Sequence, residues 1–423
     1  MALGISLLHA LTLTGLPLVG VLVVVSAMAA VEGGIALRRP RAPVSPRTLR
    51  QIALIFASAL PLWTYYLSRP LWAFDPRNVW FFAGRIMFEA GHFPLDVWGR
   101  LICHWGPDYY LNTNADYPKL IGSLAASVAT LAGYWNEYLP KIATLLLHTL
   151  ELIGFIELGW RRRAVALNVV ITIVPTYRYF FDAGLLDIHV SLLTLIAVLS
   201  FVERTGPASA RAPGDTERLD LLAMGVAAMA VASQLKFEGR ALVLIVFACA
   251  LVTRAITPRA LARVAGVFVA FVPTVMWLAE VKLFKATGYL QHSKGLPIAL
   301  VRLHHELMSV IVPRILTERL IVTGVGAVVV SLVVARLTAP NLALSTVLRD
   351  RRFLLALLVG VGYAASLVVV YLFTSYPSVL EHIISSLSRA DMAAQMGFFA
   401  AAMVALEMAR QSRAAPPVSS SSS

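Results

Sequence analysis

Two acidic side chains bound the polar loop 68–118, which lies between apolar runs of the chain. Asp75 stands near its start, within the aromatic stretch Trp72–Trp80, and Asp116 stands at its end, directly before Tyr117. A carboxylate at the edge of a membrane-embedded helix is costly to place unless it has a task. Such a group can accept a proton from an incoming hydroxyl while a nearby Arg or Lys holds a phosphate. The loop therefore predicts acid-base chemistry at a membrane surface.

Asp75 also has a purely structural interpretation, which the residues alone leave equally open. An Asp followed by a Pro at the first helical position is a strong signal for a helix N-terminus, so Asp75 would cap a helix that begins at Pro76. In the chemical interpretation Asp75 is the general base, and Arg77, Trp80 and Arg85 are candidate substrate-binding residues beside it.

A second cluster surrounds Asp187, which heads an apolar helix. Arg178 precedes it in the segment Tyr177-Arg178-Tyr179, and His189 follows it. The structural alternative is that Asp187 caps that helix near the positive end of the helix dipole. A capping role and a ligand-binding role do not exclude each other, so Asp187 is a candidate for substrate binding and Arg178 for phosphate binding.

A third cluster is the corner 234–240, with the sequence Gln-Leu-Lys-Phe-Glu-Gly-Arg, between two apolar runs. Lys236 and Glu238 would either pair with each other in a turn, or Lys236 would meet a lipid phosphate. We therefore regard Lys236 as a candidate for phosphate binding and Glu238 as a candidate for substrate binding.

A fourth segment, 381–389, alternates polar and apolar residues as an amphipathic surface helix does. It carries His382 and Arg389, two further candidates for contact with a phosphate.

Composition defines the elements that must position these groups. The chain has 423 residues, of which 58% are hydrophobic and 14% charged, whereas a soluble domain has about 25% charged residues. It is therefore predicted to be an all-α integral membrane protein, a polytopic bundle of about 11 to 12 transmembrane helices with short amphipathic helices in its long outer first loop. The expected spans are 5–31, 51–67, 140–160, 164–180, 184–203, 219–235, 240–256, 262–281, 317–336, 353–373 and 392–410, with a weaker, re-entrant or interfacial run at 119–135.

Arginine-rich connections set the predicted orientation, because Lys and Arg gather in cytoplasmic loops. These connections can all be cytoplasmic if the N-terminus is outside and 119–135 does not cross, which gives about 11 crossings. The first loop 68–118, the corner 236–240 and the segment 374–391 then lie outside. The connections are 38–50, 161–163, 204–218, 254–263, 349–352 and 410–413.

We expect a single domain over 1–414, in which 1–50 adds an N-terminal helix and a basic cytoplasmic loop, and a disordered tail over 415–423. The net charge of +13 is explained by the excess of Lys and Arg expected in cytoplasmic loops. No basic run is interleaved with aromatic residues, so nucleic acid is not an expected partner.

The candidate clusters, taken in order, resemble the GT-C superfamily of multi-spanning glycosyltransferases, and most closely its bacterial branch related to aminoarabinose transferases and protein mannosyltransferases. The resemblance covers roughly residues 50–400 and is carried by five matches. These are Asp75 and Trp80 in an Asp-x-x-x-x-Trp element, Asp116 before Tyr117-Pro118, Asp187 at the outer end of a middle helix, Lys236–Gly239 for a Lys-Asn-Glu-Gly corner, and His382, Ser386 and Arg389 in a late amphipathic segment.

What the resemblance implies is an inverting transfer of a hexose or pentose from a polyprenyl-phosphate donor to a glycan, lipid or protein acceptor. Asp75 would be the general base, Asp116, Tyr117 and Asp187 would bind substrate, and basic residues would hold the lipid phosphate. The protein would be a multi-pass protein of the inner cell membrane, surrounded by lipid, with its active site facing the periplasm or exterior. No cofactor and no metal ligand are assigned, although the resemblance leaves a divalent cation open.

Three departures from the family pattern leave the sugar and the acceptor undefined. Phe237 replaces a polar residue, His189 stands where the family often has Pro, and the helix 5–31 precedes the usual first span. The main alternative is a transporter or flippase of a lipid-linked sugar, which predicts charges near mid-membrane and repeated helices. A non-catalytic scaffold does not explain a long loop with Asp at both ends.

Overall fold

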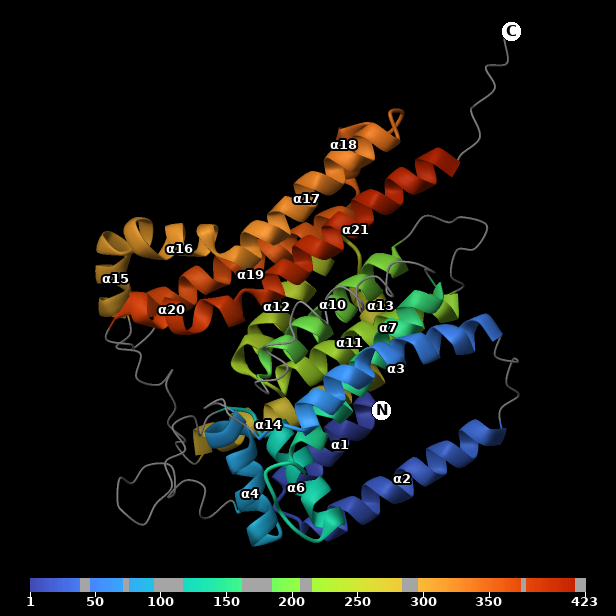
Figure 1. The fold of residues 1–423 in the computed structure, drawn as a ribbon, viewed down its shortest axis with the longest axis vertical. Helices are drawn as coiled ribbons and strands as arrows, with labels where there is room; N and C mark the ends of the chain where they lie inside the picture. The colour runs from blue at the N-terminus through green and yellow to red at the C-terminus, as the bar shows by residue number, and fades with distance from the viewer. Residues whose placement is uncertain are drawn as a thin grey trace. The chain divides into compact units, whose positions relative to one another are not determined.

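The computed structural model is helical throughout the residues that it describes, with no strand among them (Figure 1). This confirms the predicted all-α fold. Asp75, Asp116 and Arg178, three of the candidate site residues, lie outside the described residues. The described ranges are 1–38, 46–70, 76–94, 117–161, 185–205, 215–283, 296–373 and 378–414.

The chain divides into two compact units that interleave along the sequence. Unit 1 contains Met1–Ile196, Val226–Val243 and Val264–Gly295, and unit 2 contains Ala197–Gly225, Leu244–Arg263 and Leu296–Ser423. The expected single domain over 1–414 remains a prediction.

Unit 1 is built mainly from the N-terminal half of the chain. Within it, α1 packs against α2, α6 and α14, while α3 packs against α7. Its helices are α1 (Ala2–Leu13), α2 (Leu18–Arg38), α3 (Pro46–Leu67), the π-helix η1 (Pro76–Trp80), α4 (Phe81–Ala90), α6 (Leu120–Ala132), α7 (Lys141–Arg161), the 3-10 helix η2 (Ala265–Phe271) and α14 (Val272–Leu283), with parts of α10 (Asp187–Arg204), α11 (Asp215–Ser233) and α12 (Phe237–Val252).

The predicted single helix over 5–31 is wrong. The apolar run breaks into α1 and α2 because Gly15 has a φ of +76°, a left-handed conformation, and Pro17 lies just before α2. With 12 residues, α1 is only about 18 Å long, shorter than the hydrocarbon core of a bilayer. The extra N-terminal element is therefore a helical hairpin whose first half is too short to cross.

Helices α4 and α6 meet with almost no side chain between them. A Cβ on Gly84 would lie 2.8 Å from the carbonyl oxygen of Gly122, so only glycine permits this approach. Trp80 directly precedes α4, and Lys119 directly precedes α6. The two ends of the polar first loop are therefore held together.

Unit 2 centres on α21, which packs against both α17 and α19. Helix α20 buries Val379, Ile383 and Leu387 on one face, and the Ser378 hydroxyl caps it by accepting a hydrogen bond from the Glu381 amide. The helices of unit 2, besides its parts of α10 to α12, are α13 (Pro258–Arg263), α15 (Leu296–His305), the π-helix η4 (Leu307–Ile311), α16 (Val312–Thr317), α17 (Arg319–Thr338), α18 (Leu344–Arg349), α19 (Arg351–Phe373), α20 (Val379–Ala390) and α21 (Met392–Ala414).

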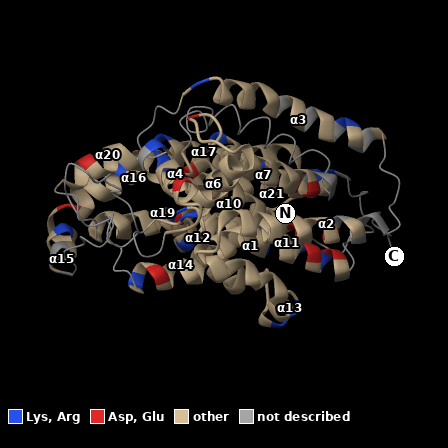
Figure 2. Cartoon of the chain, turned by 90° about the horizontal axis from the view of Figure 1, so that it is seen from below, with Lys and Arg blue, Asp and Glu red and all other residues tan. Residues whose placement is uncertain are grey.

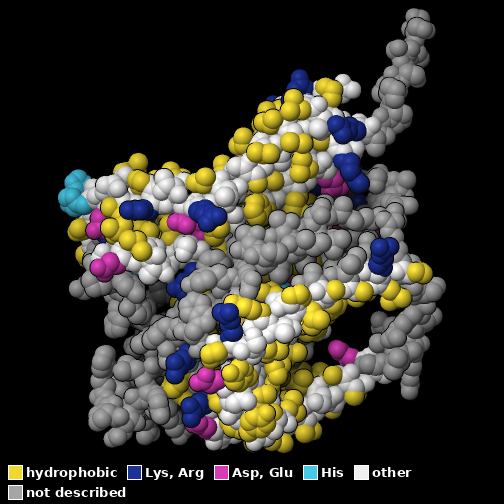
Figure 3. All heavy atoms as spheres, in the orientation of Figure 1, with side chains coloured by type: hydrophobic (Ala, Val, Ile, Leu, Met, Phe, Trp, Pro, Cys, Tyr) yellow, Lys and Arg dark blue, Asp and Glu magenta, His cyan; other side chains and the backbone are white. Residues whose placement is uncertain are grey.

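Four helical segments among the described residues are long and apolar enough to cross a membrane: Ala265–Leu283, Arg319–Thr338, Arg351–Phe373 and Met392–Arg413. Charges are sparse along the helices (Figure 2), and hydrophobic side chains cover the visible face of α17 (Figure 3). Val329 and Val333 of α17 are 54% and 52% exposed, as expected of a lipid-facing surface rather than one in water. The structure supports an integral membrane protein.

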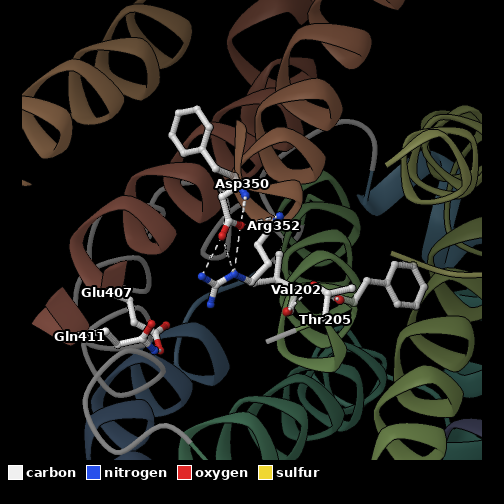
Figure 4. A network of polar contacts seen from close by, with 8 residues as sticks. Val202, Thr205, Asp350, Arg352, Glu407 and Gln411 are labelled. Atoms are coloured by element: carbon white, nitrogen blue, oxygen red, sulfur yellow. Dashed lines mark hydrogen bonds and ion pairs between the residues drawn. The ribbon is translucent and has the colours of Figure 1, made fainter. Parts of the chain in front are cut away.

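Arg352, from one of the arginine clusters expected in the cytoplasm, lies buried in unit 2 (Figure 4). Its Nε and one terminal guanidinium nitrogen donate to the Asp350 carboxylate at 3.0 and 2.9 Å. A forked guanidinium-carboxylate contact of this kind fixes both groups in one geometry. The pair thus anchors the start of α19.

Glycines let α19 and α21 approach closely. A Cβ on Gly397 would lie 2.4 Å from the backbone nitrogen of Gly360, so the two backbones are in direct contact, as in membrane helix pairs that meet through small residues.

We predict that Gly397→Ala destabilises the protein by about 1–3 kcal/mol, because the added methyl group forces α19 and α21 apart. Gly326→Ala is the matched control on α17, since its added Cβ meets nothing within 4 Å and Ala favours a helix by about 1 kcal/mol over Gly. Thermal unfolding in detergent micelles measures both. Equal melting temperatures for the two variants would contradict the close contact.

Candidate functional site

A buried ion pair joins two of the predicted clusters in unit 1. The Lys236 ammonium donates to the Asp187 carboxylate at 2.7 Å, and the two side chains are only 5% and 6% exposed. The partly buried Glu238 carboxylate lies 3.4 Å from the same ammonium. Asp187 is the first residue of α10, and its Oδ1 contacts Lys236. The local Lys236–Glu238 pair considered from sequence exists, but Asp187 is the closer partner.

The corner 234–240 can form because α11 and α12 are joined by only three residues. Gln234 and Leu235 close the turn by donating backbone hydrogen bonds to Val231 and Ala232. A Cβ on Gly239 would lie 2.0 Å from the Ala232 carbonyl oxygen, so this position accepts only glycine. The tight connection directs the Lys236 side chain into unit 1.

Three aromatic rings lie beside the ion pair and come from separate parts of the chain. The Trp80 and Tyr117 ring centroids are 5.0 Å apart, and those of Tyr117 and Phe237 are also 5.0 Å apart, both edge to face. The Lys236 ammonium lies 6.0 Å from the Trp80 ring centroid, within cation-π distance. Segments around residues 80, 117, 187 and 236 therefore meet at one place, here called the Lys236 site.

Two further cations lie close to this cluster. The buried Lys119 ammonium is 5.1 Å from the Trp277 ring, and the Arg240 guanidinium is 4.9 Å from the Phe237 ring. Neither residue is among the candidates that the sequence indicates. The available signal was position, because Lys119 directly follows Tyr117-Pro118 and Arg240 ends the corner.

The N-terminal helix also reaches this region, which the sequence did not indicate. The Gln234 side chain contacts the buried His9 ring at 3.0 Å and the Ser6 hydroxyl at 3.0 Å. The positive charges of Arg240 and Lys119 both act on the His9 ring. Helix α1 therefore contacts the corner 234–240 through His9 and Ser6.

A second group of buried polar side chains, linked by contacts from one to the next, lies in unit 1. His189 Nδ1 lies 2.9 Å from the Glu151 carboxylate, and the His189 ring meets the His148 ring edge to face at 6.4 Å. The Trp63 indole donates to His148 Nδ1 at 2.8 Å. Since an indole nitrogen only donates, His148 Nδ1 must be unprotonated. His189, a departure from the family pattern, thus holds a glutamate in the interior.

His382 and Arg389, the candidates on α20, belong to unit 2. The His382 ring packs against the Tyr371 ring at 5.2 Å, and the Arg302 guanidinium donates to the Tyr371 carbonyl oxygen. Burial, aided by the charges of Arg302 and Arg389, lowers the pKa of His382 to about 4, so the ring is neutral at physiological pH. Arg302 is not among the candidates that the sequence indicates.

The remaining candidates on the first loop lie at the surface. Arg77 is exposed, and Arg85 forms an exposed pair with Glu89 of the same helix at 2.7 Å. No group of three or more His, Cys, Asp or Glu side chains within the described ranges is arranged to hold a metal ion.

We predict that Lys236→Met destabilises the protein by about 3–5 kcal/mol, because it leaves Asp187 buried without its cation. Replacing both partners by apolar residues, as in Lys236→Met with Asp187→Leu, should recover most of this loss. The exposed Arg85–Glu89 pair is the control, and Arg85→Met should cost only about 0.2–1 kcal/mol. Chemical unfolding in micelles measures all three, and similar losses for Lys236→Met and Arg85→Met would contradict the buried pair.

Asp391, between α20 and α21, provides a pH-dependent prediction. Its buried carboxyl oxygens have no partner within the described part of the chain, and burial, with the negative charge of Glu318, raises its pKa from 3.8 to about 8. The folded state therefore holds a proton that the unfolded state loses above about pH 4, so the free energy of unfolding should fall from about pH 4 to about pH 8. Asp391→Asn should flatten this fall in melting curves recorded across that range, and an unchanged slope would contradict it.

No family model and no curated protein matches this sequence. Among solved structures, apo ArnT from Cupriavidus metallidurans aligns over 85% of this chain and 77% of its own, at 17% identity and a TM-score of 0.39.

Proposed function

We propose that this protein is a membrane glycosyltransferase of the GT-C type, which transfers a sugar from a polyprenyl phosphate to an acceptor hydroxyl at the outer face of the membrane. The single observation that supports it most is the convergence at the Lys236 site. Trp80, Tyr117, Asp187 and Lys236 belong to four separate motifs of the sequence resemblance, yet their side chains form one continuous cluster.

In the proposed reaction the acceptor hydroxyl oxygen attacks the anomeric carbon of the donor sugar. The bond between that carbon and the phosphate oxygen breaks, and polyprenyl phosphate leaves with the bonding electrons. Asp75 takes the hydroxyl proton, as a general base must. Attack on the face opposite the leaving phosphate inverts the anomeric centre. Asp116 and Glu238, with Asp187 and the aromatic residues, are proposed to bind the sugar.

The phosphate of the donor needs cations near the bond that breaks. Lys236 contacts Asp187, and two further cations lie near the same cluster, so we add Lys119 and Arg240 to the proposed phosphate-binding residues. Both bring positive charge to the site without disrupting that pair. Contact with a phosphate stays a prediction for Arg178, His382 and Arg389, as does substrate binding for Arg77 and Arg85.

One observation favours the alternative, transport of a lipid-linked sugar. Glu151 lies in the middle of α7, fully buried, in contact with His189. Buried acid-histidine pairs within membrane helices occur in proton-coupled transporters. Transport would move the donor across the membrane without cleaving its sugar-phosphate bond, so the two functions can be separated by experiment.

We predict that Asp75→Asn abolishes sugar transfer while the melting temperature stays unchanged, because the amide keeps the shape of the carboxyl group but cannot accept a proton. The assay follows release of polyprenyl phosphate from a radiolabelled polyprenyl-phosphate sugar in proteoliposomes that contain acceptor glycans. Asp220→Asn, at an exposed acid of α11, is the matched control and should keep full activity.

Two results would contradict the proposal. Full turnover by Asp75→Asn would remove its role as base. Movement of the intact labelled donor across the vesicle bilayer by the wild type, without release of polyprenyl phosphate, would make the protein a transporter.

A further inference from the structure

The side-chain amide of Gln234 has a fixed orientation. Its nitrogen donates to the backbone carbonyl oxygens of Ala230 and Ala270 at 3.0 and 2.8 Å and lies 3.0 Å from the Ser6 hydroxyl. Carbonyl oxygens only accept hydrogen bonds, so the NH2 group must face them. The amide oxygen of Gln234 therefore faces His9, whose Nδ1 lies 3.0 Å away.

This orientation fixes the tautomer of His9. An amide oxygen only accepts, so Nδ1 of His9 must carry the proton that it donates to Gln234. The positive charges of Arg240 and Lys119 act on the same fully buried ring and disfavour a second proton. His9 Nε2 is therefore an unprotonated acceptor, and no group among the described residues donates to it.

A buried acceptor without a donor destabilises a protein, and this cost is tolerated where a ligand supplies the donor. Two charged side chains, Lys119 and Arg240, act on the His9 ring, and both are positive. They would hold an anionic ligand beside the ring without using the Nε2 lone pair. A neutral donor on that ligand, such as a hydroxyl, is the group that fits the remaining acceptor.

We propose that His9 Nε2 accepts a hydrogen bond from a hydroxyl group of the sugar on the bound lipid phosphate. The short helix α1 thus supplies a substrate-binding residue from outside the motifs that the sequence pattern contains. This assignment rests on the proposed function, because it takes the ligand to be a polyprenyl-phosphate sugar.

Two variants of His9 separate ligand binding from packing. The amide of Asn occupies roughly the position of the histidine Nδ1, so His9→Asn keeps the contact to Gln234 and removes Nε2. The amide of Gln reaches roughly the position of Nε2, so His9→Gln removes the Nδ1 contact and keeps a polar group at the far end. If His9 only supports the fold, the contact made by Nδ1 is the one that matters. If His9 binds the ligand, Nε2 is the atom that matters.

The experiment measures dissociation constants of full-length protein in lipid nanodiscs. The probes are polyprenyl phosphates linked to glucose, mannose or arabinose, and polyprenyl phosphate without a sugar. His9→Asn should bind the best sugar-linked probe about threefold to tenfold more weakly than wild type, the loss of one hydrogen bond. Its affinity for the sugar-free lipid and its melting temperature should not change. His9→Gln should melt at a lower temperature and bind the sugar-linked probe more tightly than His9→Asn does.

An unchanged preference of His9→Asn for the sugar-linked lipid would overturn the proposal and leave His9 as a packing residue or the partner of a buried water. Equal losses for both lipids would also overturn it, because the contact would then concern the phosphate or the fold. A wild-type protein that binds none of the lipids would instead refute the proposed function, so the two failures differ.

Should His9→Asn not fold, nitrogen NMR of histidine-labelled wild type answers the same question. The bare Nε2 signal, assigned through His9→Gln, should shift when the sugar-linked lipid binds. A signal that is unmoved by that lipid, or moved equally by sugar-free polyprenyl phosphate, would overturn the proposal.

Discussion

The organisation of unit 1 depends on the ion pair between Lys236 and Asp187. Removing two charges from water is expensive, and the mutual attraction offsets that cost only when their geometry is close and fixed. The separation of 2.7 Å meets that requirement. It holds the start of α10 against the corner between α11 and α12, although 49 positions of sequence separate the two residues. The aromatic rings of Trp80 and Tyr117 then have a fixed surface to pack on.

The two units achieve their packing by different means. Around the corner 234–240, hydrogen bonds link buried polar groups from separate helices, and the Gln234 side chain contacts groups on α1, α11 and η2. In unit 2, α19 and α21 meet through Gly360 and Gly397 with backbone against backbone. Polar networks demand particular partners and so specify one arrangement, whereas contacts between small residues depend on shape. A site that recognises a polar ligand is better served by the first kind of packing.

Run length and hydropathy predicted most helices well. The expected runs 51–67, 140–160, 353–373 and 392–410 correspond to α3, α7, α19 and α21. The N-terminal break was missed because Gly15 and Pro17 stand within an uninterrupted apolar run, and composition alone carried the expected helix through them. Turn residues should have outweighed hydropathy there.

Pairing was harder to predict than location. The sequence showed that Lys236 and Glu238 are neighbours, so a local pair was the natural expectation, but the closer carboxylate comes from α10. Likewise, nothing local in an apolar N-terminal run marks His9 as part of a polar network. Such partners depend on how helices pack, which no window of sequence contains. The placement of Asp75, Asp116 and Arg178 remains a prediction, because they lie outside the described residues.

The contact between Gly84 and Gly122 has a consequence for how this protein could diversify. Since α4 and α6 are held backbone to backbone, Trp80 and Tyr117 stay in place whatever length of chain joins the two helices. Loop closure depends only weakly on length, and each doubling costs about 0.6 kcal/mol. Insertions or exchanges within 95–116 can therefore accumulate without moving Trp80 or Tyr117. Under the proposed function, changes in this single connection would be a route to new acceptors on an unchanged helical frame.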